Sequence, residues 1–373
     1  MASRRWVTRG PPVEIGRQAI TAPGAPDNGA GAGGDENVGP LAGLGLSCWV
    51  LSDGKIGDEV PCFGLARALG LAPARHVVRP RAVFAALAPR GPIDWREGPA
   101  APDSPIRPPF PDILIASGRR TIPYLRHVRR AARGATFAIF LKNPRIATTV
   151  ADLVWAPLHD GLRGDNVIAT LTAPHTLGEA ALAAARARPD PRIASLPGPR
   201  VALLIGGNSN SHRLAPRDVA ALTAACERFV GEGASVMITP SRRTPPHASA
   251  ALADWAAANP ARAFFWNGQG ANPYVSMLAL ADAILVTADS TNMVGEAAAT
   301  CAPVLVYEPS GGHRRLTAYV DALEAAGVVR RFRGVLERWP RTPLDATRDV
   351  AQAVAARVLA WRSGRLAHPR DVR

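Results

Sequence analysis

Lysine is almost absent from this chain of 373 residues, because only Lys55 and Lys142 among its 44 basic residues are not arginine. With 30 acidic residues the net charge is +14. The arginine excess is typical of a GC-rich bacterial genome. The arginines are scattered and lack the interleaved aromatics of RNA-binding modules, so we expect no specific nucleic-acid partner. The charge instead favours loose peripheral contact with an anionic membrane surface.

Long apolar runs are also missing. No run reaches the ~18 to 20 residues that span a bilayer, and the N-terminus lacks the apolar core of a secretory signal. We therefore expect a cytoplasmic protein that is at most peripheral at the inner face of the membrane. Gly, Ala and Pro dominate residues 1–45. Such a segment buries too little apolar surface to offset its ordering entropy, which predicts a disordered tail.

Metal-binding patterns are lacking as well. The four cysteines form no CxxC pair, and the eight histidines form no HxH or HxxxH pair. We therefore expect no metal site. Cys48 and Cys301 lie in or beside apolar runs, which predicts buried thiols and suits a reducing compartment. Nothing in the sequence indicates an oligomeric state.

What the chain does contain is a regular alternation of short apolar strands, polar loops and helices. The pattern occupies residues 46–187, is interrupted by the Pro-rich segment 188–199, and restarts over residues 200–330. This predicts an α/β fold of two facing Rossmann-like domains with a cleft between the carboxyl ends of their strands. We interpret residues 188–199 as the linker and residues 331–373 as a C-terminal helical extension.

Residues 283–309 have the pattern strand, loop, helix, strand, and they organise the second half. Asp289, Ser290 or Thr291 can cap a helix that starts near Asn292. A helix N-terminus at the end of a parallel strand is a natural anion site. Glu296 lies about one turn further on, where a carboxylate can accept hydrogen bonds from a ribose diol. An ordinary βαβ unit with a solvated glutamate is the alternative.

Five further polar loops follow predicted strands and are expected to face the same cleft. In the second half, a tight polar loop follows the first strand, and the resemblance given below implies that it approaches a diphosphate. Two arginines offer positive charge there unless they form a solvated pair. The candidates there are Gly206, Gly207, Asn208, Ser209, Arg242 and Arg243.

The first half supplies candidates for proton transfer and for phosphate contact. A compact ammonium retained where the chain otherwise uses arginine suggests a site that a planar guanidinium does not fit. A general base can come from a loop histidine or carboxylate, although capping and turn formation are alternative roles. These candidates are Asp53, Lys55, Lys142, Asn143, His159 and Asp160.

Two resemblances extend this interpretation. GGNSN after the first strand of the second half, and DSTNMVGEAAATCAPVLVYEP near its end, resemble the nucleotide-binding half of GT-B glycosyltransferases. Over most of residues 46–330, a larger set of motifs resembles a mitochondrial fission protein family whose loss elongates plant mitochondria. Bacterial members of that family are often labelled nucleoside-diphosphate-sugar epimerase-like. The motifs are SDGKIGDE, ASGRRT, FLKNPR, PLHDGLRGDNV, GGNSNSHRL, TPSRRTP, WNGQGANPY and VTADSTNMVGEA.

These resemblances imply a GT-B-like enzyme with a nucleotide-diphosphate sugar as substrate and no separate cofactor. Metal-independent glycosyl transfer is the first hypothesis, because helix N-termini and arginines can stabilise a departing diphosphate. A nucleotide-sugar epimerase or hydrolase on the same scaffold is the second. A non-catalytic adaptor is the third, although an adaptor has no need to keep every polar loop of the cleft.

Overall fold

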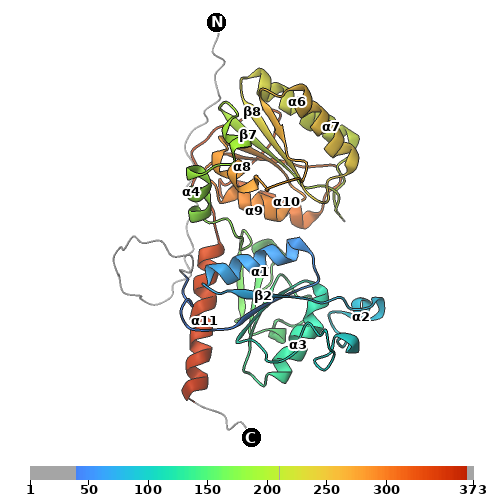
Figure 1. Cartoon of the computed structure of the whole chain (residues 1–373), viewed down its shortest axis with the longest axis vertical. Helices are drawn as coiled ribbons and strands as arrows, with labels where there is room; N and C mark the ends of the chain where they lie inside the picture. Colours follow the sequence, from blue (N-terminus) through green and yellow to red (C-terminus); the bar gives the residue numbers. More distant parts are fainter. Residues whose placement is uncertain (1–38, 210, 368–373) are drawn as a thin grey trace, which may run out of the picture.

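The computed structural model describes residues 39–209 and 211–367. Two α/β domains lie end to end along the long axis of the molecule, and each is built on a six-stranded parallel sheet (Figure 1). The prediction of two Rossmann-like domains is therefore confirmed. The central strands are nearly continuous apolar segments, as expected where helices cover both faces of a parallel sheet.

The first sheet has the strand order β2-β1-β3-β4-β5-β6. Its strands are β1 (Cys48–Ser52), β2 (Pro73–Val77), β3 (Ile113–Ser117), β4 (Phe137–Leu141), β5 (Leu153–Pro157) and β6 (Val167–Thr170). Its helices are α1 (Ile56–Ala68), α2 (Ala82–Leu87) and α3 (Ile122–Ala131), with 3-10 turns η1 (Trp95–Glu97), η2 (Arg119–Thr121), η3 (Thr148–Val150) and η4 (Leu158–Asp160).

The second sheet has the order β12-β11-β10-β7-β8-β9. Its strands are β7 (Arg200–Ile205), β8 (Ser235–Pro240), β9 (Ala263–Phe265), β10 (Ala283–Thr287), β11 (Val304–Tyr307) and β12 (Arg330–Arg331). Its helices are α4 (Glu179–Ala187), α5 (Pro191–Ala194), α6 (Pro216–Gly231), α7 (Pro246–Ala258), α8 (Tyr274–Leu280), α9 (Thr291–Ala298) and α10 (Arg314–Ala325).

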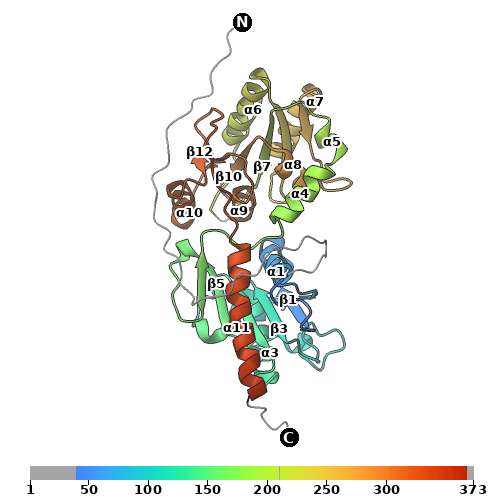
Figure 2. The same ribbon diagram turned by 90° about the vertical axis from the view of Figure 1, so that its left-hand side faces the viewer.

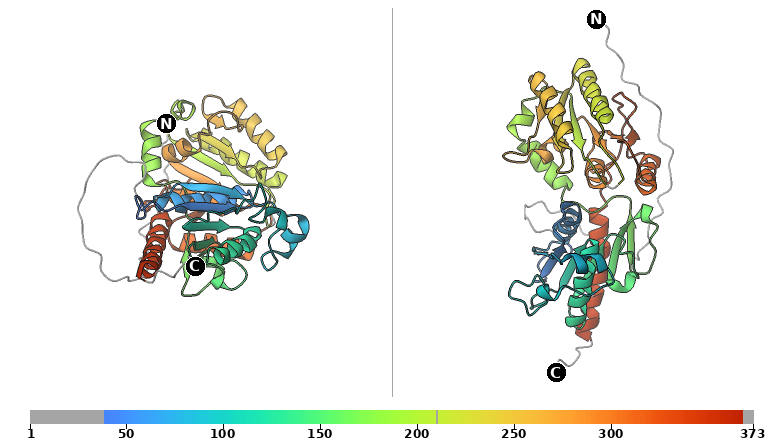
Figure 3. Two further views of the ribbon diagram at one scale, coloured as in Figure 1. Left: turned by 60° about the horizontal axis from the view of Figure 1, so that its bottom comes forward. Right: turned by 90° about the vertical axis from the view of Figure 1, so that its right-hand side faces the viewer.

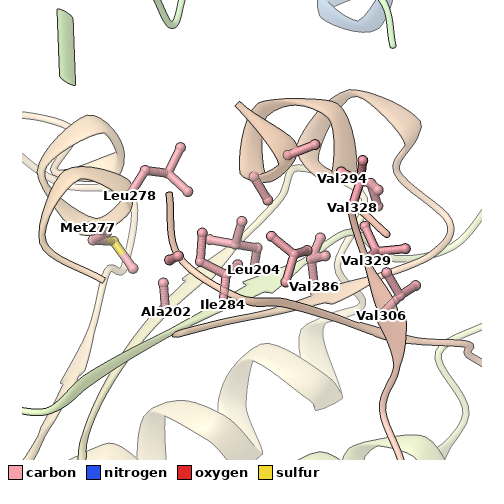
Figure 4. Close-up of a cluster of buried hydrophobic side chains, with 14 of the residues drawn as sticks. Ala202, Leu204, Met277, Leu278, Ile284, Val286, Val294, Val306, Val328 and Val329 are labelled. Atoms are coloured by element: carbon pink, nitrogen blue, oxygen red, sulfur yellow. The ribbon is translucent and has the colours of Figure 1, made fainter. Parts of the chain in front are cut away.

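Each sheet carries an apolar core on both faces. In the second domain, Leu204, Val286 and Val306 come from three neighbouring strands and pack toward Val294 of α9 (Figure 4). All four side chains are buried. This packing fixes α9 against the sheet and sets where its N-terminus lies.

Several of the predicted loops lie at the point where the strand order of each sheet reverses. The second sheet, read from β9, has the Rossmann order 3-2-1-4-5-6, with its switch point between β7 and β10. The first sheet reverses between β1 and β3. Open α/β sheets bind ligands at such crevices. The loops after β7, β10 and β1 contain more than half of the predicted site residues, and the others follow β4, β5 and β8.

The domain boundary differs from the predicted one. Residues 188–199 were expected to form a linker, but Ile193 of α5 is fully buried and Leu196 nearly so in the core of the second domain. Leu182 of α4 packs into the same core. The chain crosses between the domains earlier, near residues 171–176. The prolines of the segment thus shape a packed turn instead of a free connection.

The C-terminal helix returns to the first domain. α11 (Thr347–Ala367) runs along that domain (Figure 2). Val350, Val354 and Val358 are buried in its core together with strands β1, β3 and β4. The extension predicted at residues 331–373 is therefore only partly helical: α11 belongs to the first domain in space, whereas residues 332–346 are not helical and Leu336 is buried in the core of the second domain.

The structure also bears on the expectations about the N-terminal tail, the cysteines and membrane-spanning segments. Most of the tail predicted at residues 1–45 lies outside the described residues. Leu41, however, is buried and its amide donates to the Leu69 carbonyl at 3.0 Å, so residues 39–45 belong to the first domain. Cys48 is buried as predicted, but Cys301 is exposed, because it lies in the turn between α9 and β11. Within the described residues, no helix is long and apolar enough to cross a membrane.

Candidate functional site

The acidic loop of the first domain forms two ion pairs at the switch point between β1 and β3. Asp53 accepts from Lys55 Nζ at 2.5 Å, and Asp58 of α1 accepts from Lys142 Nζ. The Asp53 side chain is almost fully buried, and its Oδ1 has no hydrogen-bond partner among the described residues. The rare lysines are thus brought to one place, each held by a carboxylate. Lys55 remains 64% exposed, and its contact with a ligand stays a prediction.

Lys142 occupies an unusual backbone position. Its φ is +93°, a left-handed value that costs a residue with a Cβ free energy, and such strain concentrates at functional sites. Its Nζ also donates to the Gly57 carbonyl at 3.3 Å. The same carbonyl accepts from Asn292 Nδ2 of α9 at 3.3 Å, across the domain boundary. Gly57 therefore joins the first-domain loop to the start of α9.

The N-terminus of α9 is open. Ser290 is its N-cap residue, but within residues 39–209 and 211–367 no side chain accepts a hydrogen bond from the first turn, so the capping expected from Asp289, Ser290 or Thr291 is wrong. The amides of Thr291, Asn292 and Met293 have no acceptor among the described residues. Unpaired amides and the helix dipole make this end attractive to an anion.

Glu296 lies one turn inside α9 and is nearly buried. Tyr274 of α8 donates to its Oε2 at 2.6 Å, while Oε1 accepts no hydrogen bond from a described residue. Burial raises the pKa of Glu296 to about 7, an effect that the Tyr274 hydroxyl partly offsets. The solvated glutamate of the alternative interpretation is therefore not what the structure contains.

The two glycines after β7 allow close packing of main chain on main chain. A Cβ on Gly206 would lie 2.2 Å from Asp289 Oδ2, and one on Gly207 would lie 2.1 Å from the Arg243 carbonyl. Their amides already donate within the protein, Gly206 to Thr287 Oγ1 and Gly207 to Asp289 Oδ2. These glycines shape the crevice, and their amides are engaged instead of being open to a diphosphate.

The neighbouring arginines differ from each other. Arg243 donates to the buried Asp289 Oδ2 at 2.9 Å and, at 3.5 Å, to the Asp289 carbonyl beside the start of α9. Burial raises the pKa of Asp289, although the Arg243 charge opposes that shift. Arg242 is exposed and makes no hydrogen bond or ion pair with the described part of the chain. Arg243 thus supplies the ordered positive charge.

Three predicted polar side chains organise their own loops. The Asn143 Oδ1 accepts from the Arg145 amide at 2.9 Å, and the Asn208 Oδ1 accepts from the Leu214 amide at 3.0 Å. Ser209 Oγ accepts from the His212 amide at 3.0 Å. Loop-forming bonds of this kind are the ordinary role of short polar side chains at turns.

His159 and Asp160 lie in η4 and meet α10 of the second domain. The His159 ring centroid lies 5.1 Å from that of Tyr319, and Asp160 pairs with Arg315 at 3.5 Å. The Tyr319 hydroxyl donates to the Thr291 carbonyl at 3.2 Å, which places His159 beside α9. Burial lowers the pKa of His159, against the opposing effect of Asp160. A neutral imidazole at pH 7 can accept a proton.

The sequence interpretation missed a polar pocket in the second domain. A cavity of about 400 Å³ is lined by the loops after β7, β10 and β11, including His212, Arg217 and Ser310. His212 is buried, and its Nδ1 lacks a partner among the described residues. The GGNSNSHRL motif contained this histidine, but only the fold brings it next to Ser310. No group of three or more His, Cys, Asp or Glu able to hold a metal occurs in the described ranges.

Comparison with known proteins assigns this chain to a family. The family model described as Mitochondrial fission ELM1 matches residues 56–358. The mitochondrial fission protein ELM1 of Arabidopsis thaliana is 31% identical over 270 residues, 65% of this chain and 63% of that protein. An uncharacterized protein of Rickettsia prowazekii (strain Madrid E) is 29% identical over 169 residues, 41% of this chain and 45% of the relative. The chain therefore spans less than two thirds of either relative.

Solved structures with related architecture are more distant. MurG of Acinetobacter baumannii has 12% identity and a TM-score of 0.43, covering 86% of this chain and 95% of its own. The UDP-GlcNAc 2-epimerase of Methanocaldococcus jannaschii has 12% identity and a TM-score of 0.48, covering 84% and 99%. The fold assignment rests on the strand orders given above. Because the family model covers most of the residues from α1 to α11, the chain belongs to the Mitochondrial fission ELM1 family.

Proposed function

We propose that this protein binds a nucleotide-diphosphate sugar between its two domains and transfers the sugar to an acceptor without a metal ion. The observation that carries the proposal is Glu296, a nearly buried carboxylate with one unpaired oxygen, one turn inside a helix whose N-terminus is open. A carboxylate in that position fits a ribose diol, while the open amides fit the adjacent phosphates.

The diphosphate is stabilised by charge in this proposal. The amides of Thr291, Asn292 and Met293 and the guanidinium of Arg243 lie at the same end of α9. As the bond between sugar and diphosphate breaks, negative charge grows on the departing oxygen. Donors held in place before the reaction stabilise that charge without reorganisation.

The acceptor side is assigned to the first domain. The neutral His159 takes the proton of the acceptor hydroxyl as its oxygen bonds to the sugar. Asp160, held by Arg315, is well placed to orient the loop that carries the imidazole. Asp53, with its unpartnered buried Oδ1, is the alternative base on the opposite loop.

Calorimetric titration with UDP-, GDP-, ADP- and dTDP-sugars tests the proposal. One of these ligands is expected to bind, and Glu296→Gln should weaken it by about 1.5 to 3 kcal/mol, the range for a hydrogen bond to a charged group. Glu227→Gln, a glutamate of α6 that bonds Trp255 on another side of the second domain, is the matched control. Unchanged affinity in Glu296→Gln would remove the ribose role, and no binding by any ligand would refute the proposal. Product analysis then separates transfer from epimerisation or hydrolysis.

A further inference from the structure

A strongly basic cavity lies in the first domain, away from the carboxyl ends of its strands. The cavity measures about 660 Å³, and its lining includes Arg90, Arg126, Arg129 and Arg130, with Trp361 of α11 at one side. Thr136, at the amino end of β4, also lines it. The amino end of a parallel strand is remote from the carboxyl end that faces α9, so this cavity is separate from the candidate site.

The positive charge of this cavity is not balanced. Its one carboxylate, Asp152, is paired with Arg129 and also accepts from the Ala138 amide at 2.8 Å. Arg90 and Arg130 are exposed, and their guanidinium groups bond no residue that the structure describes. Two guanidinium groups are therefore free to meet an external anion.

The surrounding helices extend the basic surface. No acidic residue occurs between Ile122 and Gly134, a segment that contains α3 and Arg133, or in residues 352–367 of α11, which contain Arg357, Arg362 and Arg365. α3 and the end of α11, teal and red in Figure 3, lie at this end of the molecule. The Phe137 ring contacts Trp361 with centroids 5.6 Å apart, so the end of α11 packs against β4.

An exposed apolar tip adjoins the basic surface. Val83 and Leu87, one turn apart on α2, are 66% and 52% exposed, and Trp95 is 69% exposed. The Phe84 and Trp95 rings meet edge to face at 5.2 Å. The Arg126 guanidinium donates to the Arg90 carbonyl at 3.2 Å, just beyond α2, so the tip and the cavity are neighbours. α2 projects from the first domain (Figure 1).

We propose that this face, made of the α2 tip, α3 and the end of α11, docks on an anionic lipid bilayer. Arginines without carboxylate partners match the charge of the lipid headgroups. Exposed aliphatic and indole side chains can be buried at the boundary between the headgroups and the acyl chains, which is favourable. A nucleic acid offers Val83 and Leu87 no comparable apolar environment. Peripheral binding needs two such signals together, and this face supplies both. The basic cavity lies away from α9, whereas α2 is held from η2, where the Arg119 guanidinium donates to the Ala85 and Ala88 carbonyls at 2.9 and 3.0 Å.

Co-sedimentation of the full chain with vesicles tests the proposal. The protein should bind phosphatidylcholine vesicles containing phosphatidylglycerol, and should be released from them by 0.5 M salt, but should not bind pure phosphatidylcholine. Arg90→Glu/Arg130→Glu should lower partitioning at least tenfold, because each reversal replaces an attraction with a repulsion. Val83→Ser/Leu87→Ser/Trp95→Ser should also lower it while leaving salt-dependent residual binding.

The control must carry the same net charge. Arg188→Glu/Arg333→Glu changes two exposed arginines of the second domain and should bind vesicles nearly as the unmodified protein does. Equal loss in both double variants, or no binding to phosphatidylglycerol vesicles, overturns the proposal. Tighter binding to a duplex DNA oligonucleotide than to vesicles at the same salt also overturns it, in favour of nucleic acid. Glu296→Gln should bind vesicles normally, which keeps this test separate from the proposed enzymatic function.

Discussion

At the scale of single residues, the site depends on groups whose chemistry is set by burial. Glu296 is nearly buried with only the Tyr274 hydroxyl as a donor, so its proton is held more tightly than in water. His159 is shifted the other way by burial and favours its neutral form. Burial therefore favours the neutral form of both groups. Hydrogen bonds from a polar ligand would favour the ionised form of Glu296, and the neutral imidazole of His159 can accept a proton.

Glu296 should make stability depend on pH. Its folded-state pKa of about 7 lies above the ordinary glutamate value of 4.5, so the folded protein binds the proton more tightly than the unfolded chain. The stabilisation is complete below pH 4.5 and is lost as pH rises through 7. The difference corresponds to about 3 kcal/mol.

Chemical denaturation at pH 5 and pH 8 measures this effect. Glu296→Gln should lose less stability between these two pH values than the unmodified protein does, because glutamine does not titrate. Comparing the two proteins cancels the contribution of other titrating groups. Identical pH dependence in both proteins would contradict the assigned pKa shift.

At the scale of elements, close packing against neighbouring loops determines the backbone conformation of the loop after β7. Gly207 has a φ of +147° and lies against the Arg243 main chain, while Gly206 lies against Asp289. Ser241 and Thr244, on the loop after β8, donate to the Gly206 carbonyl. The two loops thus form one unit that holds Arg243 beside α9.

Gly207→Ala should destabilise this unit. The added Cβ would overlap the Arg243 carbonyl at 2.1 Å, and alanine is strained at this φ. We expect a loss of at least about 2 kcal/mol, from overpacking together with backbone strain, measured by thermal unfolding. Gly231→Ala is the control, since a Cβ there meets nothing within 4 Å and the residue lies in α6. Comparable losses in both variants would show that loop packing is not the cause.

At the scale of the whole molecule, the chain crosses between the domains twice. It leaves the first domain near Thr172 and returns near Thr347, whose Oγ1 accepts from the His175 amide at 3.1 Å. The His175 ring lies 3.5 Å from Asp345 at the same junction. Asn292 with Gly57, and Asp160 with Arg315, add contacts across the domain boundary. The crossing segments are therefore tied together where the two domains meet.

Val354→Asp should unfold the first domain selectively. Val354 of α11 is fully buried in that domain's core, so the carboxylate would be buried without a partner. Hydrogen exchange should show lost protection in β1, β3 and β4, with β7, β8 and β10 still protected. Gln352→Asp on the exposed side of α11 should leave exchange unchanged. Loss confined to the second sheet would contradict the placement of α11.

The sequence by itself determined the two α/β domains, and it predicted a binding site at the loops after β7 and β10, which stays a prediction. Apolar strand periodicity and small polar residues at strand ends are local signals, and they can be recognised in the sequence without knowing which elements pack together. The tertiary structure alone decided that α4 and α5 belong to the second core and that α11 completes the first, because burial depends on which faces meet. It also decided that α9 is uncapped, that Glu296 is buried beside Tyr274 and that the amides of the two glycines are engaged. The last two are contacts between residues distant in sequence, and no local pattern encodes them.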